Sequence, residues 1–135
     1  MSNEAHPPYR LSLCLDSFET LGPYERGGVL RALVEVLARA NGIYAARVGA
    51  PHLYEAGVRY VDTHDEWRDI PRVLEARGGD CKDLVAWRVA ELRAQRVAAV
   101  PRIIMQQQGP GSYLYHVVVQ LPSGAYEDPS KILGM

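Results

Sequence analysis

Apolar residues recur every three or four positions in the first third of the chain. This spacing predicts an amphipathic helix over residues 24–40, and the Asn41-Gly42 pair that follows predicts its end. The residues expected on its buried face are Val29, Leu33, Val36, Leu37 and Ala40.

Residues 10–15 show a different period, because three leucines alternate with Ser12 and Cys14. Alternation of this kind predicts a short strand or an apolar arm laid on the core. Cys14 would then be a buried, space-filling thiol. Residues 43–66 give no clear period, and a short extended piece at Val58 to Val61 is the one element suggested there.

A second helix is predicted over residues 80–96. Asp80 is a typical N-cap residue, and Asp83 stands where its carboxylate can bond the backbone N–H of the cap. The positions that share the apolar face of this helix are Cys81, Val85, Val89 and Leu92. A shorter helix is expected from Asp69 through Val73-Leu74, and Gly78-Gly79 would end it.

The last third of the chain is rich in valine, isoleucine and tyrosine. Strands are predicted at residues 99–107, 113–121 and 126–128. Pro122-Ser123-Gly124 fits a three-residue hairpin loop, which is a type I turn followed by a left-handed residue. Because helices come first and antiparallel strands last, the predicted fold class is α+β.

Composition limits the class of protein. The chain of 135 residues fits one domain, expected to span residues 1–135 with a loose arm at 1–9. The formal net charge of −1 argues against nucleic acid as a partner, and no stretch approaches the ~20 apolar residues that cross a membrane. Two cysteines are too few for a secreted disulfide framework, and no secretory signal is visible. We therefore expect a soluble, cytoplasmic protein.

Cys81 is the candidate nucleophile, because it opens the second predicted helix directly behind Gly78-Gly79-Asp80. The partial positive charge and free N–H groups of a helix N-terminus favour thiolate over thiol and can bind a developing oxyanion. Glycines lack a Cβ and let a substrate backbone approach. Gly79 and Asp80 are therefore candidates for the oxyanion or substrate site. The alternative for Cys81 is a structural role in the core.

His116 and Asp128 become partners through the register of the predicted hairpin. If Leu121 pairs with Ala125, then Val118 faces Asp128, and Asp128 lies diagonally across from His116 on the same face. An imidazole–carboxylate bond there would orient a general base beside a thiol. A slip of one residue would place Asp128 on the opposite face. The alternative for Asp128 is a turn residue before Pro129.

Three motifs in this order resemble the transglutaminase-like superfamily of cysteine enzymes, especially its small bacterial and phage members. They are Gly78-Gly79-Asp80-Cys81-Lys82-Asp83-Leu84, Tyr115-His116-Val117-Val118 and Glu127-Asp128-Pro129-Ser130, and the segment 65–74 is similar too. The resemblance covers about residues 60–130. It implies a papain-like core with the cysteine helix packed on a C-terminal antiparallel sheet. It also implies that Cys81, His116 and Asp128 are nucleophile, base and orienting acid.

From these residues and this resemblance we expect a cysteine peptidase or amidase that cleaves a peptide or protein amide through a thioester. Transglutaminase-type transfer to an amine is an alternative, and so is a non-catalytic phage or bacterial binding or assembly module on the same fold. Trp67 could line the acyl pocket or help the oxyanion site, although a core tryptophan over the cysteine helix is favoured. Zinc on the same residues is disfavoured, because Cys-x-x-Cys and His-x-x-x-His pairs are absent. No metal or cofactor is expected.

Overall fold

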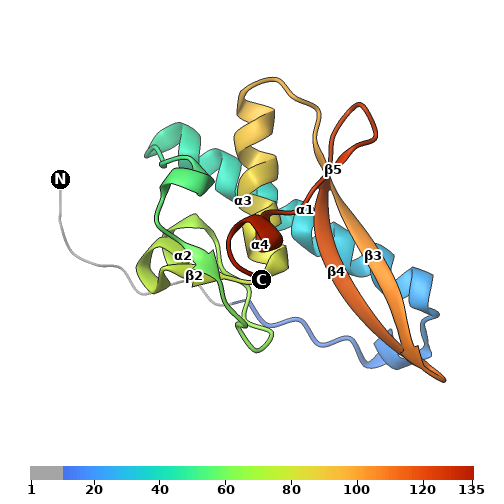
Figure 1. The fold of residues 1–135 in the computed structure, drawn as a ribbon. Coiled ribbons are helices and arrows are strands. Elements are labelled where there is room, and N and C mark those ends of the chain that lie inside the picture. Colours follow the sequence, from blue (N-terminus) through green and yellow to red (C-terminus); the bar gives the residue numbers. More distant parts are fainter. Residues whose placement is uncertain (1–10) are drawn as a thin grey trace.

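The computed structural model describes residues 11–135, and its mixture of helices and strands confirms the α+β class (Figure 1). The predicted loose arm at 1–9 lies outside the described residues. The elements in chain order are η1 (Asp16–Thr20), α1 (Pro23–Arg47), η2 (Leu53–Glu55), β1 (Arg59–Tyr60), α2 (Ile70–Ala76), β2 (Gly78–Gly79), α3 (Cys81–Ala94), β3 (Val100–Gly109), β4 (Ser112–Gln120), β5 (Tyr126–Glu127) and α4 (Pro129–Ile132).

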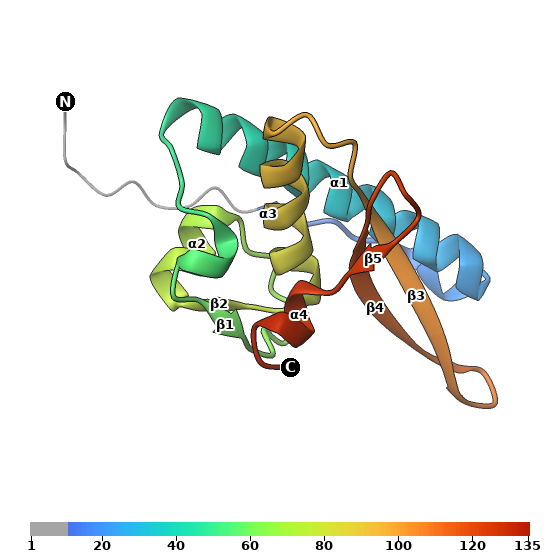
Figure 2. The same cartoon turned by 45° about the horizontal axis from the view of Figure 1, so that its top comes forward.

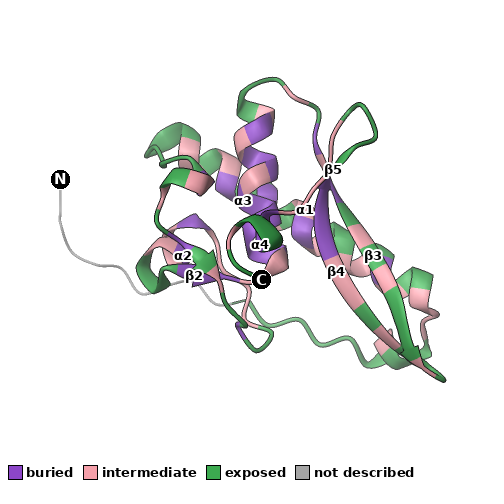
Figure 3. Ribbon diagram, in the orientation of Figure 1, coloured by how far each residue is buried: buried purple, intermediate pink, exposed green. Residues whose placement is uncertain are grey.

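Helix α3 stands at the centre, with α1 and the β3–β4 hairpin packed against it (Figure 2). It begins at Cys81 behind its N-cap Asp80 and ends at Ala94, so the second predicted helix is confirmed to within two residues. Most of α3 is buried, and its apolar side chains join those of α1 and β4 in one core (Figure 3). That core consists of Val34, Ala38, Val85, Ala86, Val89, Leu92, Ala99, Val117 and Val119.

Helix α1 is longer than predicted, because Asn41-Gly42 does not end it. Asn41 is buried and its Oδ1 accepts a hydrogen bond from the Ile70 backbone N–H at 2.9 Å, which keeps this turn against the core. The buried face is also rotated from the predicted one, and Val36 is 63% exposed. Gly27 lies on the buried face, where an added Cβ would make ordinary contacts of 3.7–4.0 Å with Ile103, Tyr115 and Met105.

Two further predictions were wrong. Arg77, in the left-handed conformation with φ 59°, ends α2, and Gly78-Gly79 instead forms β2, which pairs in parallel with β1. Residues 11–15 form neither a strand nor a buried arm, and Cys14 is exposed. The pairing partner that a strand would need is absent for this segment within the described part of the chain.

The second sheet has the order β3-β4-β5 and carries the predicted register. Val119 pairs with Glu127, and the Leu121 N–H bonds the Ala125 carbonyl at 2.9 Å. Gly124 has φ 89°, as the third residue of this turn requires. β5 is shorter than expected, because the chain turns into α4 directly after Asp128.

Candidate functional site

Cys81 lies at the edge of β4 that β5 leaves open. In an antiparallel ladder, alternate residues direct their N–H and C=O groups to the same side. Since the Leu121 N–H bonds Ala125 on the β5 side, the Val117 N–H points to that side as well. β5 ends at Glu127, opposite Val119, and the Val117 N–H on this open edge lowers the pKa of the Cys81 thiol.

His116 precedes Val117 on β4, so its backbone is one residue from the contact with the thiol. Its Nε2 lies 2.8 Å from Asp128 Oδ2, which is the pairing that the predicted register requires. The two side chains are 24% and 21% exposed. Because Asp128 occupies Nε2, Nδ1 is the ring nitrogen left to exchange a proton with a thiol or a substrate.

Asp128 is fixed at two points. It is the N-cap of α4, where its Oδ1 accepts a hydrogen bond from the Lys131 backbone N–H at 3.4 Å, while Oδ2 meets His116. Asp128 is therefore both a turn residue before Pro129 and the partner of the His116 imidazole. A side chain held by a helix cap needs little reordering to keep an imidazole in one orientation.

Burial raises the pKa of the Cys81 thiol. The Val117 N–H and the charge and backbone N–H of Lys82 lower the pKa, but by less than burial raises it, and the Asp80 carboxylate raises it further. The backbone N–H of Lys82 at the start of the helix lowers the thiol pKa, as predicted, but desolvation of the sulfur raises the pKa by more.

Gly79 and Asp80, the residues predicted for the oxyanion or substrate site, are closely packed by neighbouring side chains. Gly79 is buried, and a Cβ there would lie 2.9 Å from the Asp83 Cβ. The absent side chain thus makes room for Asp83. Asp80 Oδ2 accepts hydrogen bonds from Lys82 Nζ at 2.6 Å and Thr63 Oγ1 at 2.7 Å. These contacts hold the loop before α2 against the start of α3.

Asp83 is the anchor that sequence reasoning did not single out as part of the site. Its side chain is fully buried and accepts hydrogen bonds from the backbone N–H groups of Arg68 at 2.8 Å and Asp80 at 3.1 Å. Burial raises the pKa of this carboxyl to about 7. The bond to Asp80 is the predicted helix-capping contact, whereas the bond to Arg68 joins segments that no local pattern connects.

Trp67 packs half-buried against the same core cluster as Cys81, and Lys82 Nζ lies 5.2 Å from its ring centroid. This position is the one expected of the favoured alternative, in which Trp67 is a core residue that packs over the cysteine helix.

A second network, which the sequence does not reveal, ties α3 to β5. Arg88 donates to Glu127 from Nε at 2.6 Å and to Glu91 at 2.8 Å, and Tyr54 donates its hydroxyl to Glu127 at 2.6 Å. Glu127 immediately precedes Asp128. The network therefore fixes the strand that presents Asp128 relative to the helix that presents Cys81.

Comparisons of the chain with protein-family models, with curated proteins and with solved structures give no match. In the part of the chain from residue 11 onward, no three histidine, cysteine, aspartate or glutamate side chains are placed to share a metal ion. No helix in that part is long and apolar enough to cross a membrane.

Proposed function

We propose that this chain is a thiol-dependent hydrolase of amide or peptide bonds, with Cys81 as nucleophile, His116 as base and Asp128 as the residue that orients His116. The observation that carries the proposal is the 2.8 Å contact between His116 Nε2 and Asp128 Oδ2, on a strand whose next backbone N–H lowers the pKa of the Cys81 thiol. The resemblance of the three motifs to the transglutaminase-like superfamily, and hence to a papain-like core, supports the same assignment.

In this mechanism His116 removes the Cys81 proton through Nδ1 as the sulfur attacks the carbonyl carbon of the substrate. The carbonyl π electrons move to oxygen, and the negative charge returns to re-form C=O as the C–N bond breaks. The proton on His116 passes to the departing amine, which leaves a thioester on Cys81. Water then attacks the thioester, gives its proton to His116, and releases the carboxylic acid and the thiol. Asp128 stabilises the imidazolium at both stages.

The raised pKa of the Cys81 thiol favours proton transfer during attack over a preformed thiolate–imidazolium pair. Two backbone N–H groups, those of Val117 and Lys82, face the sulfur and stabilise the charge that develops there. Alkylation of Cys81 by iodoacetamide should therefore need a higher pH than the ~8.5 at which a free thiol is half ionised. Rapid alkylation well below neutral pH would contradict this form of the mechanism.

Acetylation by p-nitrophenyl acetate, followed by intact-protein mass spectrometry, tests the assignment without a known substrate. We expect one acetyl group on Cys81, lost in Cys81→Ala and retained in Cys14→Ala, which removes the exposed thiol. His116→Ala should slow acetylation by about 10²–10⁴-fold, the usual contribution of a general base. Asp128→Asn should slow it less. Equal rates in wild type and His116→Ala, or acetylation of Cys14 alone, would reject the catalytic role.

The fate of the acetyl-enzyme separates hydrolysis from transfer. We expect acetate as the product and little change in turnover when methylamine is added. Formation of N-methylacetamide at the expense of acetate would replace hydrolysis by transglutaminase-type acyl transfer. A stable acetyl-Cys81 that neither water nor the amine resolves would favour the binding or assembly module.

A further inference from the structure

β3 is an edge strand, and its free edge can be assigned residue by residue. Even-numbered residues of β4 direct their N–H and C=O groups toward β3, since the odd-numbered ones face β5. Their partners on β3 include Arg102 and Ile104, so the backbone groups of Ile103 and Met105 point outward. Pro101 shares this parity and lacks an N–H, as a residue facing a free edge can.

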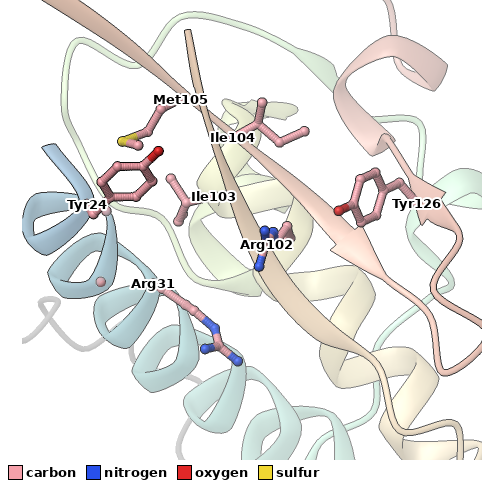
Figure 4. A pocket seen from close by; sticks show the side chains of 9 residues that line it. Tyr24, Arg31, Arg102, Ile103, Ile104, Met105 and Tyr126 are labelled. Atoms are coloured by element: carbon pink, nitrogen blue, oxygen red, sulfur yellow. The ribbon is translucent and has the colours of Figure 1, made fainter.

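A hollow of about 470 Å³ follows this edge, between β3 and the first half of α1 (Figure 4). The residues that line it are Tyr24, Gly27, Gly28, Arg31, Arg102, Ile103, Ile104, Met105 and Tyr126. Its walls are mainly apolar, and Arg31 and Arg102 supply the charge. The arginine ion pairs found within residues 11–135 belong to Arg26, Arg68, Arg72, Arg88 and Arg93. Neither arginine of the hollow makes a direct ion pair in that part of the chain, although the charge of Arg31 helps to lower the pKa of Glu35 on the same helix.

The segment 11–15 carries apolar side chains that the rest of residues 11–135 leaves exposed. Leu11, Leu13 and Leu15 are 96%, 64% and 40% exposed, which leaves a row of apolar side chains in water. Their alternation is that of a strand with one apolar face, yet no strand pairs with the segment among residues 11–135. It is followed directly by Asp16, an acidic residue. Its pattern and charge therefore complement those of the β3 edge.

We propose that residues 11–15 of a second copy of this chain add as a strand to the free edge of β3, and that two copies exchange these segments in a closed dimer. The leucines would face the α1 wall at Tyr24 and Gly28. Cys14 would face the opposite wall at Ile104, and Asp16 would lie near the two arginines. The outward N–H and C=O groups of Ile103 and Met105 would bond the added strand.

The same chain's segment is held away from this hollow. Arg26 of α1 donates hydrogen bonds to the carbonyls of Phe18 at 2.9 Å and Glu19 at 2.8 Å and lies over the Phe18 ring, which fixes η1 at the start of α1. From η1 the segment extends toward α2 and not along β3 in either view (Figures 1 and 2). A second copy is therefore the occupant that the geometry favours.

Light scattering on the full-length protein after size exclusion, over a range of concentrations, tests the dimer. We expect the wild type to approach twice the mass of one chain as concentration rises. Leu13→Asp should shift dissociation to at least tenfold higher concentration, whereas Val36→Asp, at a position that is 63% exposed on α1, should not. Met105→Pro removes one outward N–H and should weaken the dimer without loss of helical circular dichroism. A monomer at every concentration would overturn the proposal.

Disulfide formation locates the segment. In a Cys81→Ser background, Ile104→Cys should give an intermolecular disulfide with Cys14 on oxidation, and Gly28→Cys on the opposite wall should give much less. A disulfide within one chain would assign the hollow to its own segment. A dimer that forms equally in Leu13→Asp, or equal cross-linking at both walls, would assign the association to another surface. Each of these results rejects strand exchange, and none depends on Cys81 chemistry.

Discussion

Replacement of Asp83 by alanine tests whether the start of the cysteine helix is held by one buried carboxylate. Asp83 bonds the backbone N–H groups of Arg68 and Asp80 at 2.8 and 3.1 Å, and its side chain is fully buried. Alanine leaves both N–H groups without an acceptor, and water has no access to the site. The loop before α2 and the first turn of α3 would lose their common anchor.

The expected magnitude follows from the number of donors. A buried donor left without its partner costs about 1–3 kcal/mol, so the loss of two should lower the free energy of unfolding by about 2–6 kcal/mol. That is a large part of the ~5–15 kcal/mol by which a domain is usually stable. Asparagine keeps one acceptor oxygen and should recover about 1–3 kcal/mol of the loss.

The expected order of stability is wild type, then Asp83→Asn, then Asp83→Ala. Urea denaturation followed by circular dichroism at one fixed pH measures it. Asp69→Ala is the matched control, because Asp69 also caps a helix, accepting from the Arg72 N–H at 3.2 Å, but is only half-buried. That control should lose about 1 kcal/mol, the usual value of an N-cap. If Asp83→Ala loses no more than Asp69→Ala, or if asparagine is as destabilising as alanine, the anchoring role of Asp83 is refuted.

Two further predictions concern the same end of α3. Burial raises the pKa of Asp83 from 3.8 to about 7, so the native protein holds a proton that the unfolded chain has released. The stability of wild type relative to Asp83→Asn should be greatest in acid and should fall as the pH rises from 3.8 to about 7. The fall should be at most about 4 kcal/mol, since one pKa unit corresponds to about 1.4 kcal/mol. Denaturation measured across this pH range would contradict the prediction if the stability of wild type relative to Asp83→Asn rose with pH. Gly79→Ala should cost about 1–3 kcal/mol, because its Cβ would lie 2.9 Å from that of Asp83, whereas Gly42→Ala, with open space around it on α1, should gain up to about 1 kcal/mol. Thermal melts compare the two, and equal effects would refute the packing argument.

The parts of the fold that followed from the sequence are those that local chemistry decides. Pro122-Ser123-Gly124 specifies one turn, and that turn fixes the register of β4 on β5. Asp80 and Asp83 mark the start of α3 in the same way. The end of α1 did not follow, because the bond from Ile70 to Asn41 joins residues 29 positions apart. A local stop signal is overridden by a contact of that kind.

The same distinction between local and long-range contacts applies to the candidate site. The contact of His116 with Asp128 was predictable, because both belong to one hairpin and its register decides the face. The pKa of Cys81 was not, because it depends on how deeply the packing of β4 buries the sulfur. The packing role of Gly79 was not predictable for a similar reason. Its missing Cβ serves a side chain in the next helical turn, which the sequence places nearby without showing its direction.

The short sequence separation of His116 and Asp128 has a consequence for the order of folding. Their contact spans 12 positions and needs β4, one tight turn and the first residues of α4. Contacts this local close with little loss of chain entropy and form early. Cys81 reaches them after α3 has docked across the chain. The His116–Asp128 contact can therefore form before Cys81 is in place, and the proposed site would be complete only when α3 has packed against β4.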